Sequence, residues 1–336
     1  MTAVHPTAPL LSVDSLAVSI KTRDGGTVLP VREATFSIAP GETMALVGES
    51  GCGKSMTCLA ISGLLPKRGR VSAGSAVLDG TDLAGLDAKA MREMRRRKIA
   101  FVFQDATNGL NPVKTVGWQI AEAVMLREGV SRRAARSRCL ELLARVGMPD
   151  PKARAKEFPH QLSGGMNQRA MIALAVAGSP RLLIADEATT ALDVTIQAQI
   201  LALIDDLRRE FGMAVIFVTH DLGLVAEMAD KVAVMYAGRV VESAAVADLF
   251  ARPDHPYTSG LLGSLPRVDE RRSELQVIPG QVPPINAMPQ GCSFAPRCPR
   301  ASEVCRTERP LLEPHPIDAC QARVLACHKP VERAVA

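Results

Sequence analysis

The stretch Gly48-Glu49-Ser50-Gly51-Cys52-Gly53-Lys54-Ser55 decides the fold of this chain. It follows the spacing G-x-x-x-x-G-K-[ST], in which backbone N–H groups of a glycine-rich loop surround phosphate oxygens. Lys54 adds a positive charge at the terminal phosphates, and the Ser55 hydroxyl is placed to bind Mg²⁺. The apolar run 43–47 predicts a buried strand before the loop, and 54–65 predicts a helix after it, whose N-terminus favours an anion. The sequence therefore predicts a nucleotide-binding site.

Further apolar runs alternate with helical patterns along the chain. A polar residue follows each of three predicted buried strands: 99–103 precedes Gln104, 182–185 precedes Asp186, and 214–219 precedes His220. Helical patterns cover 116–146, 167–177 and 196–211, and a hairpin is predicted around Ala237-Gly238. Strands that alternate with helices predict an α/β sheet that binds its ligand at the carboxyl ends of the strands.

The composition of the 336 residues limits the possible partners. The net charge is +5, and aromatic residues make up 3% of the chain, which disfavours base stacking on single-stranded nucleic acid. No apolar run has the length of a membrane helix, and the N-terminus lacks a signal-peptide pattern, so we expect a cytoplasmic protein that serves a membrane only as a peripheral subunit. The basic helix predicted at 88–98 is interpreted as a solvated face, with a nucleic-acid patch as the alternative.

Two further stretches carry chemistry. The strand 182–185 delivers Asp186, which can hold Mg²⁺, and Glu187, which can act as a general base on the attacking water. In 162–169, Ser163 precedes two glycines at the start of a predicted helix. This pattern fits a second phosphate-binding helix N-terminus or, alternatively, an ordinary helix cap with a tight turn.

The order and spacing of these motifs resemble those of the ATP-binding cassette (ABC) ATPases, from residue 10 to about 245. Ser163-Gly164-Gly165-Met166-Asn167-Gln168 is similar to their signature motif, Gln104 to the Q-loop glutamine, Ala191-Leu192-Asp193 to the D-loop and His220 to the switch histidine. The resemblance implies a P-loop NTPase fold with a RecA-like core, an antiparallel β subdomain and a helical subdomain at about 110–175.

The resemblance also implies roles for individual residues. Glu187, His220 and Gln104 would be catalytic, and Ser55, Gln104 and Asp186 would bind Mg²⁺. The implied ATP contacts are Gly48, Ser50, Gly51, Cys52, Gly53, Lys54, Ser55, Met56, Asp186, Ser163, Gly164, Gly165, Gln168, Asp193 and Ile20. Two cassettes would pair head to tail, so that ATP on the P-loop of one is covered by Ser163 and Gly165 of the other.

A narrower resemblance, to the dipeptide/oligopeptide permease ATPase subunits, covers essentially the whole chain. It is carried by 183–200 and by His255-Pro256-Tyr257-Thr258, and Thr189-Thr190 with Gln104-Asp105 favour the D-type over the F-type subunit. It implies ATP-driven import of di- or oligopeptides, with two membrane permeases, an F-type ATPase or a second copy, and indirectly a solute-binding protein as partners. The alternatives are a nickel importer subunit, a DNA-repair or translation ABC ATPase, and an inactive regulatory cassette.

A change in composition near residue 250 separates a predicted nucleotide-binding domain, 1–250, from a proline-rich, loop-rich extension, 251–336. The extension contains Cys292, Cys298, Cys305, Cys320 and Cys327. Soft thiolate ligands alone favour zinc, whereas the family resemblance implies a [4Fe–4S] cluster whose fourth ligand is Cys320 or Cys327. Free thiols are the third possibility.

Four departures from the family pattern stand out. Ile20 replaces an aromatic residue that stacks on adenine, Ala188 replaces a proline, Asn167 replaces an arginine, and 106–109 differ after Gln104. None removes a catalytic group, so we expect an active ATPase with weaker adenine stacking and an altered contact between the Q-loop and the membrane partner.

Overall fold

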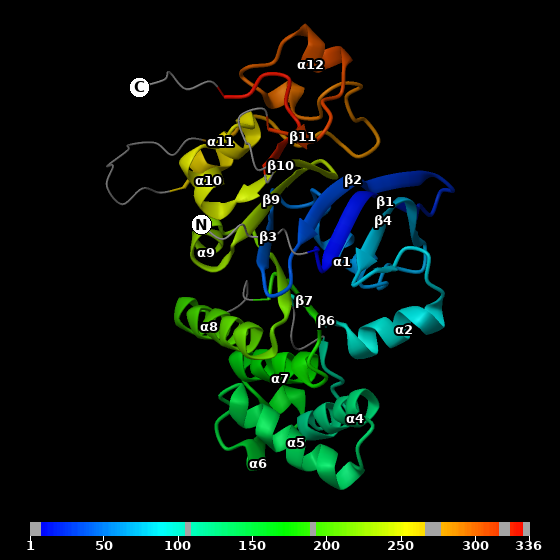
Figure 1. Ribbon diagram of the computed structural model, residues 1–336, viewed down its shortest axis with the longest axis vertical. Coiled ribbons are helices and arrows are strands. Elements are labelled where there is room, and N and C mark those ends of the chain that lie inside the picture. The colour runs from blue at the N-terminus through cyan, green and yellow to red at the C-terminus, as the bar shows by residue number, and fades with distance from the viewer. Residues whose placement is uncertain (1–7, 105–108, 189–192, 266–276, 316–322, 332–336) are drawn as a thin grey trace. The chain divides into compact units, whose positions relative to one another are not determined.

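The structure, a computed structural model, describes residues 8–104, 109–188, 193–265, 277–315 and 323–331 (Figure 1). The chain divides into two compact units. Unit 1 comprises 1–38, 43–84 and 219–336, and unit 2 comprises 39–42 and 85–218. The predicted phosphate loop and the predicted C-terminal extension therefore belong to the same unit.

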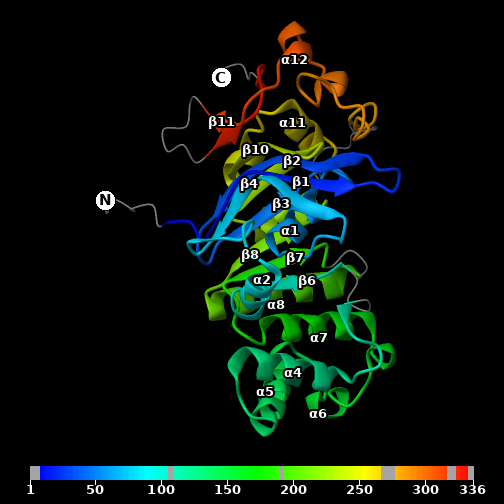
Figure 2. The ribbon, with the colours of Figure 1, turned by 90° about the vertical axis from the view of Figure 1, so that its right-hand side faces the viewer.

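An antiparallel layer forms one part of unit 1 (Figure 2). Its strands are β1 (Leu11–Lys21), β2 (Thr27–Ile38), β4 (Gly69–Leu78) and β5 (Thr81–Asp82). In β1, Leu11 lies opposite both Ile38 and Leu78, and all three side chains are fully buried. Burial of these apolar side chains fixes the strand register, because a shift by one residue would turn them to the other face.

A second set of strands in unit 1 supports the phosphate loop. β3 (Thr43–Val47) is buried along its whole length and pairs in parallel with β9 (Lys231–Tyr236), which forms a hairpin with β10 (Arg239–Ala245). The hairpin turn is the predicted one, with Ala237 and Gly238 at φ +48° and +82°. Helix α1 (Lys54–Ile61) follows β3, α9 (Leu222–Met228) precedes β9, and α10 (Val246–Ala251) follows β10.

The C-terminal part of unit 1 has little regular structure, as its proline content predicts. Its elements are α11 (Pro256–Gly263), the short 3₁₀ helix η2 (Ala295–Arg297), α12 (Glu303–Thr307), β11 (Glu313–Pro314) and β12 (Val324–Leu325). β12 pairs antiparallel with β10, and Phe294 packs into the core beside Tyr236 and Tyr257. The extension is thus part of the unit 1 sheet and core.

Unit 2 contains a parallel sheet and a helical group, visible as α4, α5, α6 and α7 in Figure 1. The strands are β6 (Ile99–Val102), β7 (Leu182–Asp186) and β8 (Ala214–Val218), with β7 between the other two. The helices are α2 (Ala88–Arg97), α4 (Val116–Glu128), α5 (Arg132–Arg145), α6 (Pro151–Arg154), η1 (Pro159–Gln161), α7 (Gly164–Val176) and α8 (Val194–Phe211). The predicted α/β class is confirmed.

The helical pattern at 116–146 is two helices rather than one. Gly129 adopts φ +70° and ends α4, and the Ser131 side chain accepts a hydrogen bond from Ala134 N to begin α5. A glycine in the left-handed region followed by a serine cap is the usual arrangement for a helix–helix turn. Hydrophobic periodicity alone runs through this short break, which is why the pattern indicated continuous helix.

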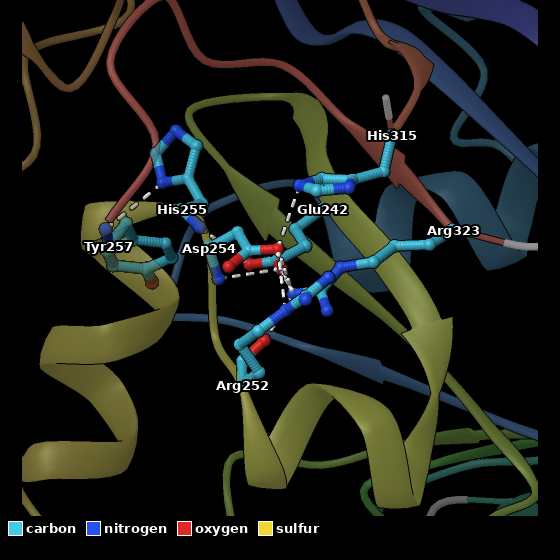
Figure 3. Close-up of polar contacts among 7 residues, drawn as sticks. All are labelled: Glu242, Arg252, Asp254, His255, Tyr257, His315 and Arg323. Carbon is cyan, nitrogen blue, oxygen red and sulfur yellow. Dashed lines mark hydrogen bonds and ion pairs between the residues drawn. The ribbon is translucent and has the colours of Figure 1, made fainter. Parts of the chain in front are cut away.

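A buried polar network joins the extension to β10 (Figure 3). The fully buried Glu242 accepts hydrogen bonds from the backbone N–H groups of Asp254 and His255, each at 3.0 Å, and forms an ion pair with Arg323. Asp254 in turn pairs with Arg323 and with His315, both at 3.0 Å. Removing one partner of a buried ion pair typically costs about 3–5 kcal/mol, so this network holds His315 and Arg323 against Asp254 and Glu242.

His255 gives unit 1 a pH dependence that can be measured. Its Nδ1 accepts a hydrogen bond from Tyr257 N at 3.0 Å, and burial lowers the pKa of its imidazole to about 4, although the Glu242 charge opposes the shift. The unfolded chain therefore binds a proton below about pH 6.5 that the folded chain does not, and the free energy of unfolding should fall by about 3 kcal/mol between pH 6.5 and pH 4. Urea unfolding at several pH values measures this slope.

The control compares two histidine variants. His255→Asn should reduce the slope between pH 6.5 and pH 4, because the buried titrating group is gone. His160→Asn should leave the slope unchanged, because His160 is exposed. Equal slopes in the wild type and His255→Asn would contradict the assignment.

Candidate active site

The phosphate loop in unit 1 ends in a helix N-terminus that no side chain caps. Gly53 is the N-cap of α1, adopts φ +106° and has no side chain to accept from the first-turn N–H groups, and no acidic residue lies in that turn. The first four N–H groups of a helix lack intrahelical partners and carry a partial positive charge. The loop therefore fits a phosphate group, which would accept from the N–H groups at Lys54, Ser55 and Met56.

Close backbone contacts explain the glycines of this loop. A Cβ on Gly48, at φ +149°, would lie 2.2 Å from the Met235 carbonyl oxygen, and a Cβ on Gly53 would lie 2.6 Å from the Pro30 carbonyl oxygen. Gly51 needs its φ of +77° but has open space around it. β9 and β2 of unit 1 thus pack closely against the loop. Only glycine, which has no Cβ, fits at positions 48 and 53.

Lys54 is held beneath the loop. Its side chain is buried, and its Nζ donates to the carbonyl oxygens of Gly48 at 2.8 Å and Glu49 at 3.1 Å. The neighbouring Cys52 is also buried, and desolvation raises the pKa of its thiol, so Cys52 is a packed side chain rather than a nucleophile. The lysine ammonium therefore lies at the loop, where it can contact a terminal phosphate.

In unit 2, the predicted catalytic carboxylate and the Q-loop glutamine meet. Val102 of β6 lies opposite Ala185 of β7, so that Gln104 and Glu187 follow at the same edge of the parallel sheet. Gln104 Nε2 donates to Glu187 Oε2 at 2.9 Å, and Glu187 N donates to the Val218 carbonyl at 3.0 Å. Glu187 adopts φ +47°, a conformation that costs a non-glycine residue about 1–2 kcal/mol. The carboxylate is thus fixed in orientation and can accept a proton from water.

The predicted signature stretch forms a capped helix N-terminus in unit 2. Ser163 is the N-cap of α7, and its hydroxyl accepts from Met166 N at 3.3 Å. A Cβ on Gly165 would lie 3.1 Å from the Ile196 side chain of α8. Asn167 donates to the Pro159 carbonyl at 3.0 Å, so the residue that departs from the family arginine anchors α7 to η1. Both interpretations made from the sequence remain compatible with this geometry, since a capped helix N-terminus can also face a phosphate.

The other predicted site residues are distributed over both units. His220 is exposed, and Ile20 is partly buried at the end of β1, both in unit 1. In unit 2, Asp186 ends β7, Gln168 is buried in α7, and Asp193 accepts from Ile196 N at 2.9 Å to cap α8. The roles assigned to all these residues stay predictions. Thr189, Thr190, Ala191, Leu192, residues 105–108 and Cys320 lie outside the described residues.

Two contacts to the phosphate loop were not expected from the sequence. The Glu49 carboxylate pairs with Arg297, and Glu49 N donates to the Tyr257 hydroxyl at 2.8 Å. Tyr257 belongs to the stretch 255–258 that carried the family resemblance, but nothing in that stretch indicated a contact with the loop. Arg297 lies between two of the cysteines and has no local pattern of its own.

Comparison with known proteins decides the family. The chain is 46% identical, over 98% of its length and 96% of the relative's, to the oligopeptide transport ATP-binding protein OppD of Salmonella typhimurium. The chain belongs to the oligopeptide/dipeptide family of ABC transporter ATP-binding subunits. Residues 31–190 match the ABC transporter family, and residues 241–305 match the family described as the oligopeptide/dipeptide transporter C-terminal region.

Other members of this family and several solved structures agree. A putative peptide import ATP-binding protein of Brucella melitensis is 51% identical over 90% of this chain and 93% of its own. The dimeric ATP-binding cassette MJ0796, in a post-hydrolysis state bound to ADP and Pi, is 28% identical with a TM-score of 0.63, covering 70% of this chain and 98% of that one. The cbiO1 cassette of Clostridium perfringens, part of the ABC transporter complex cbiONQ, gives a TM-score of 0.62 over 73% of this chain and 92% of its own. The predicted P-loop NTPase fold and ATPase class are confirmed.

None of the described helices is both long and apolar enough to cross a bilayer. As a member of this family, the chain is the ATP-binding part of a membrane transporter, and its association with a membrane is that of a peripheral subunit.

The prediction of an iron–sulfur cluster is wrong. Cys292, Cys298, Cys305 and Cys327 line one small cavity, but no three His, Cys, Asp or Glu side chains within the described parts of the chain are arranged to hold a metal ion, whether iron or zinc. The relatives are described only as peptide transport ATPases. Burial raises the pKa of the Cys327 thiol to about 12 and also raises that of the Cys292 thiol. The spacing of the cysteines along the sequence did not determine how their side chains are arranged in space.

Gly48→Ala tests the close approach of the phosphate loop to β9. The added methyl group would clash with a backbone carbonyl at 2.2 Å, so the loop must move and ATP affinity should fall by at least ~10-fold, or about 1.4 kcal/mol. Gly51→Ala is the control, because Gly51 also has a positive φ, at +77°, but a Cβ there meets no atom, so the change should cost only about 1 kcal/mol of backbone strain. Fluorescent nucleotide titration of both variants measures the difference, and equal losses would contradict the packing argument.

Proposed function

We propose that this chain hydrolyses ATP to drive import of di- or oligopeptides through a membrane ABC permease. The observation that carries the proposal is the combination, in one compact unit, of an intact phosphate loop and the oligopeptide/dipeptide transporter C-terminal region. The identity with a peptide transport ATP-binding protein over nearly the whole chain supports it. In this reading residues 1–250 form the nucleotide-binding domain and 251–336 form an extension specific to this kind of transporter.

The contacts of Glu187 support hydrolysis by a water molecule that this carboxylate activates. Glu187 accepts a proton from the attacking water, and the amide of Gln104 holds the carboxylate in position at 2.9 Å. Lys54 and the N–H groups at the start of α1 bind the β- and γ-phosphates, and His220 orients the terminal phosphate. Ser55 and Asp186 would hold Mg²⁺, which would supply positive charge beside the phosphate oxygens.

The two helix N-termini support a head-to-tail pairing of two cassettes. Ser163 caps α7, which begins with Gly164 and Gly165. The backbone N–H groups at this helix N-terminus complete the ATP site on the phosphate loop of a second cassette. The second cassette is a homologous F-type subunit or another copy of this chain. The pair docks on two permease subunits at the inner face of the cell membrane, and a solute-binding protein delivers the peptide on the other side.

Reconstitution tests the transport function. The chain, co-expressed with candidate permeases and an F-type subunit, should give ATP-dependent uptake of labelled di- or oligopeptides into vesicles. Ni²⁺ uptake without peptide uptake would identify a nickel importer, and hydrolysis stimulated by DNA or ribosomes rather than by permeases would identify a non-transport ATPase. Either result would overturn the proposal.

Glu187→Gln should separate ATP binding from ATP hydrolysis. The amide keeps the size of the side chain but cannot accept the proton, so hydrolysis should fall by at least ~100-fold while ATP affinity changes little. Glu141→Gln is the control, because Glu141 is an exposed residue on α5 whose loss should leave hydrolysis unchanged. Phosphate release and nucleotide titration measure the two quantities. Hydrolysis at the wild-type rate in Glu187→Gln would remove Glu187 from the mechanism.

A further inference from the structure

Arg297 of the extension contacts Glu49 of the phosphate loop in the same chain. We infer that Arg297 is a positioning residue for ATP binding, which holds the phosphate loop in its binding conformation through Glu49. The inference rests on the nucleotide-binding role of the loop and is independent of the transported substrate.

The contact is a two-pronged ion pair. Arg297 Nη1 lies 2.8 Å from Glu49 Oε2, and Arg297 Nη2 lies 3.0 Å from Glu49 Oε1, between residues 248 positions apart in the chain. The Arg297 side chain is only 5% exposed, whereas Glu49 is 28% exposed. A planar guanidinium that meets both oxygens of a carboxylate fixes its orientation as well as its distance. Glu49 therefore has one favoured position.

Arg297 is itself held from several sides. Its Nε donates to the Pro279 carbonyl at 2.9 Å, and Nη2 donates to the Ile278 carbonyl at 3.3 Å. The guanidinium carbon lies 5.8 Å from the centre of the Tyr236 ring and 5.9 Å from that of Phe294. Hydrogen bonds to Glu49 raise the pKa of Arg297 further, so the charge is permanent. The other contacts hold the Arg297 side chain in this position independently of the phosphate loop.

Tyr257 adds a second support from the same part of the chain. Its hydroxyl accepts from Glu49 N at 2.8 Å, and its ring is fully buried with its centre 4.6 Å from that of Tyr236. Glu49 is therefore held at its backbone and at its carboxylate. The Glu49 carbonyl accepts from Lys54 Nζ at 3.1 Å, so the position of Glu49 also sets where the lysine ammonium lies.

The extension that carries Arg297 is anchored elsewhere in unit 1. The buried network around Glu242 joins the extension to β10 through Arg323 (Figure 3). β12 pairs with the same strand. Phe294, three positions before Arg297, is buried in the core. A loop held by such a support is preorganised, and ATP then binds without the cost of ordering the loop.

Conservative variants test this role in the full-length ATPase. Arg297→Lys keeps the charge and loses the second hydrogen bond, and Glu49→Gln keeps the shape and loses the charge. Each should raise the KM for ATP about tenfold and change kcat less than twofold, because the ion pair acts on binding rather than on the attacking water. Since both act through one contact, the double variant should raise KM no more than the larger single effect.

Arg309→Lys is the matched control. Arg309 lies in the same extension and pairs with Glu33 at 3.3 Å, in a contact that is 41% and 34% exposed and does not involve the loop. Its KM should equal that of the wild type. Thermal unfolding without nucleotide checks that the variants are folded, and Glu49→Gln, at a partly exposed position, serves if Arg297→Lys does not fold.

Three outcomes would overturn the inference. They are a KM unchanged in both single variants, an additive effect in the double variant, and an equal rise of KM in Arg309→Lys. The readout needs no permease, so failure of peptide uptake would bear on the transport proposal alone.

Discussion

The backbone contact between Gly48 and the Met235 carbonyl is the constraint on which the nucleotide site depends. It places the phosphate loop directly against β9, and a second contact of the same kind places Gly53 against Pro30 of β2. With both ends of the loop fixed by neighbouring strands, its N–H groups stay turned toward the space where phosphates bind. α1 then begins without a side-chain cap, which leaves its N-terminus available to an anion. The short loop thus obtains its shape from strands that are far away in sequence.

The same unit also uses charge to fix this loop, in addition to close packing. Arg297 and Tyr257 both contact Glu49, which meets the extension with its backbone N–H and with its carboxylate. At the glycines the loop packs so closely against neighbouring strands that a Cβ would not fit. The ion pair adds a directed attraction between Arg297 and Glu49. In this chain the extension is therefore more than an appended segment, since its Tyr257 and Phe294 belong to the core of the unit that contains the phosphate loop.

Much of the fold and part of the site could be predicted from the sequence, because they depend on local patterns. The loop 48–55, the strands before Gln104 and Asp186, and the β9–β10 hairpin are all encoded by short runs with a fixed spacing. The break at Gly129 was missed because it interrupts a helical period by only a few residues. The ion pair between Glu49 and Arg297 could not be predicted, because no local pattern relates residues so far apart. The cysteines show the opposite error, since a plausible spacing suggested a cluster that the geometry of the described residues does not form.

The pairing of β12 with β10 has a consequence for the solubility of shortened chains. β10 pairs with β9 along most of its length, but on its other side it meets β2 only at Arg239 and β12 only at Glu242 and Ser243. A chain that ends before Arg323 would lack β12 and leave that part of the edge of β10 unpaired, and the buried Glu242 carboxylate would have lost its arginine. Open strand edges recruit strands from other molecules. Arg323 and β12 thus protect the edge of β10 from pairing with other molecules. A protein shortened before Arg323 is expected to aggregate, which would hide any effect on catalysis.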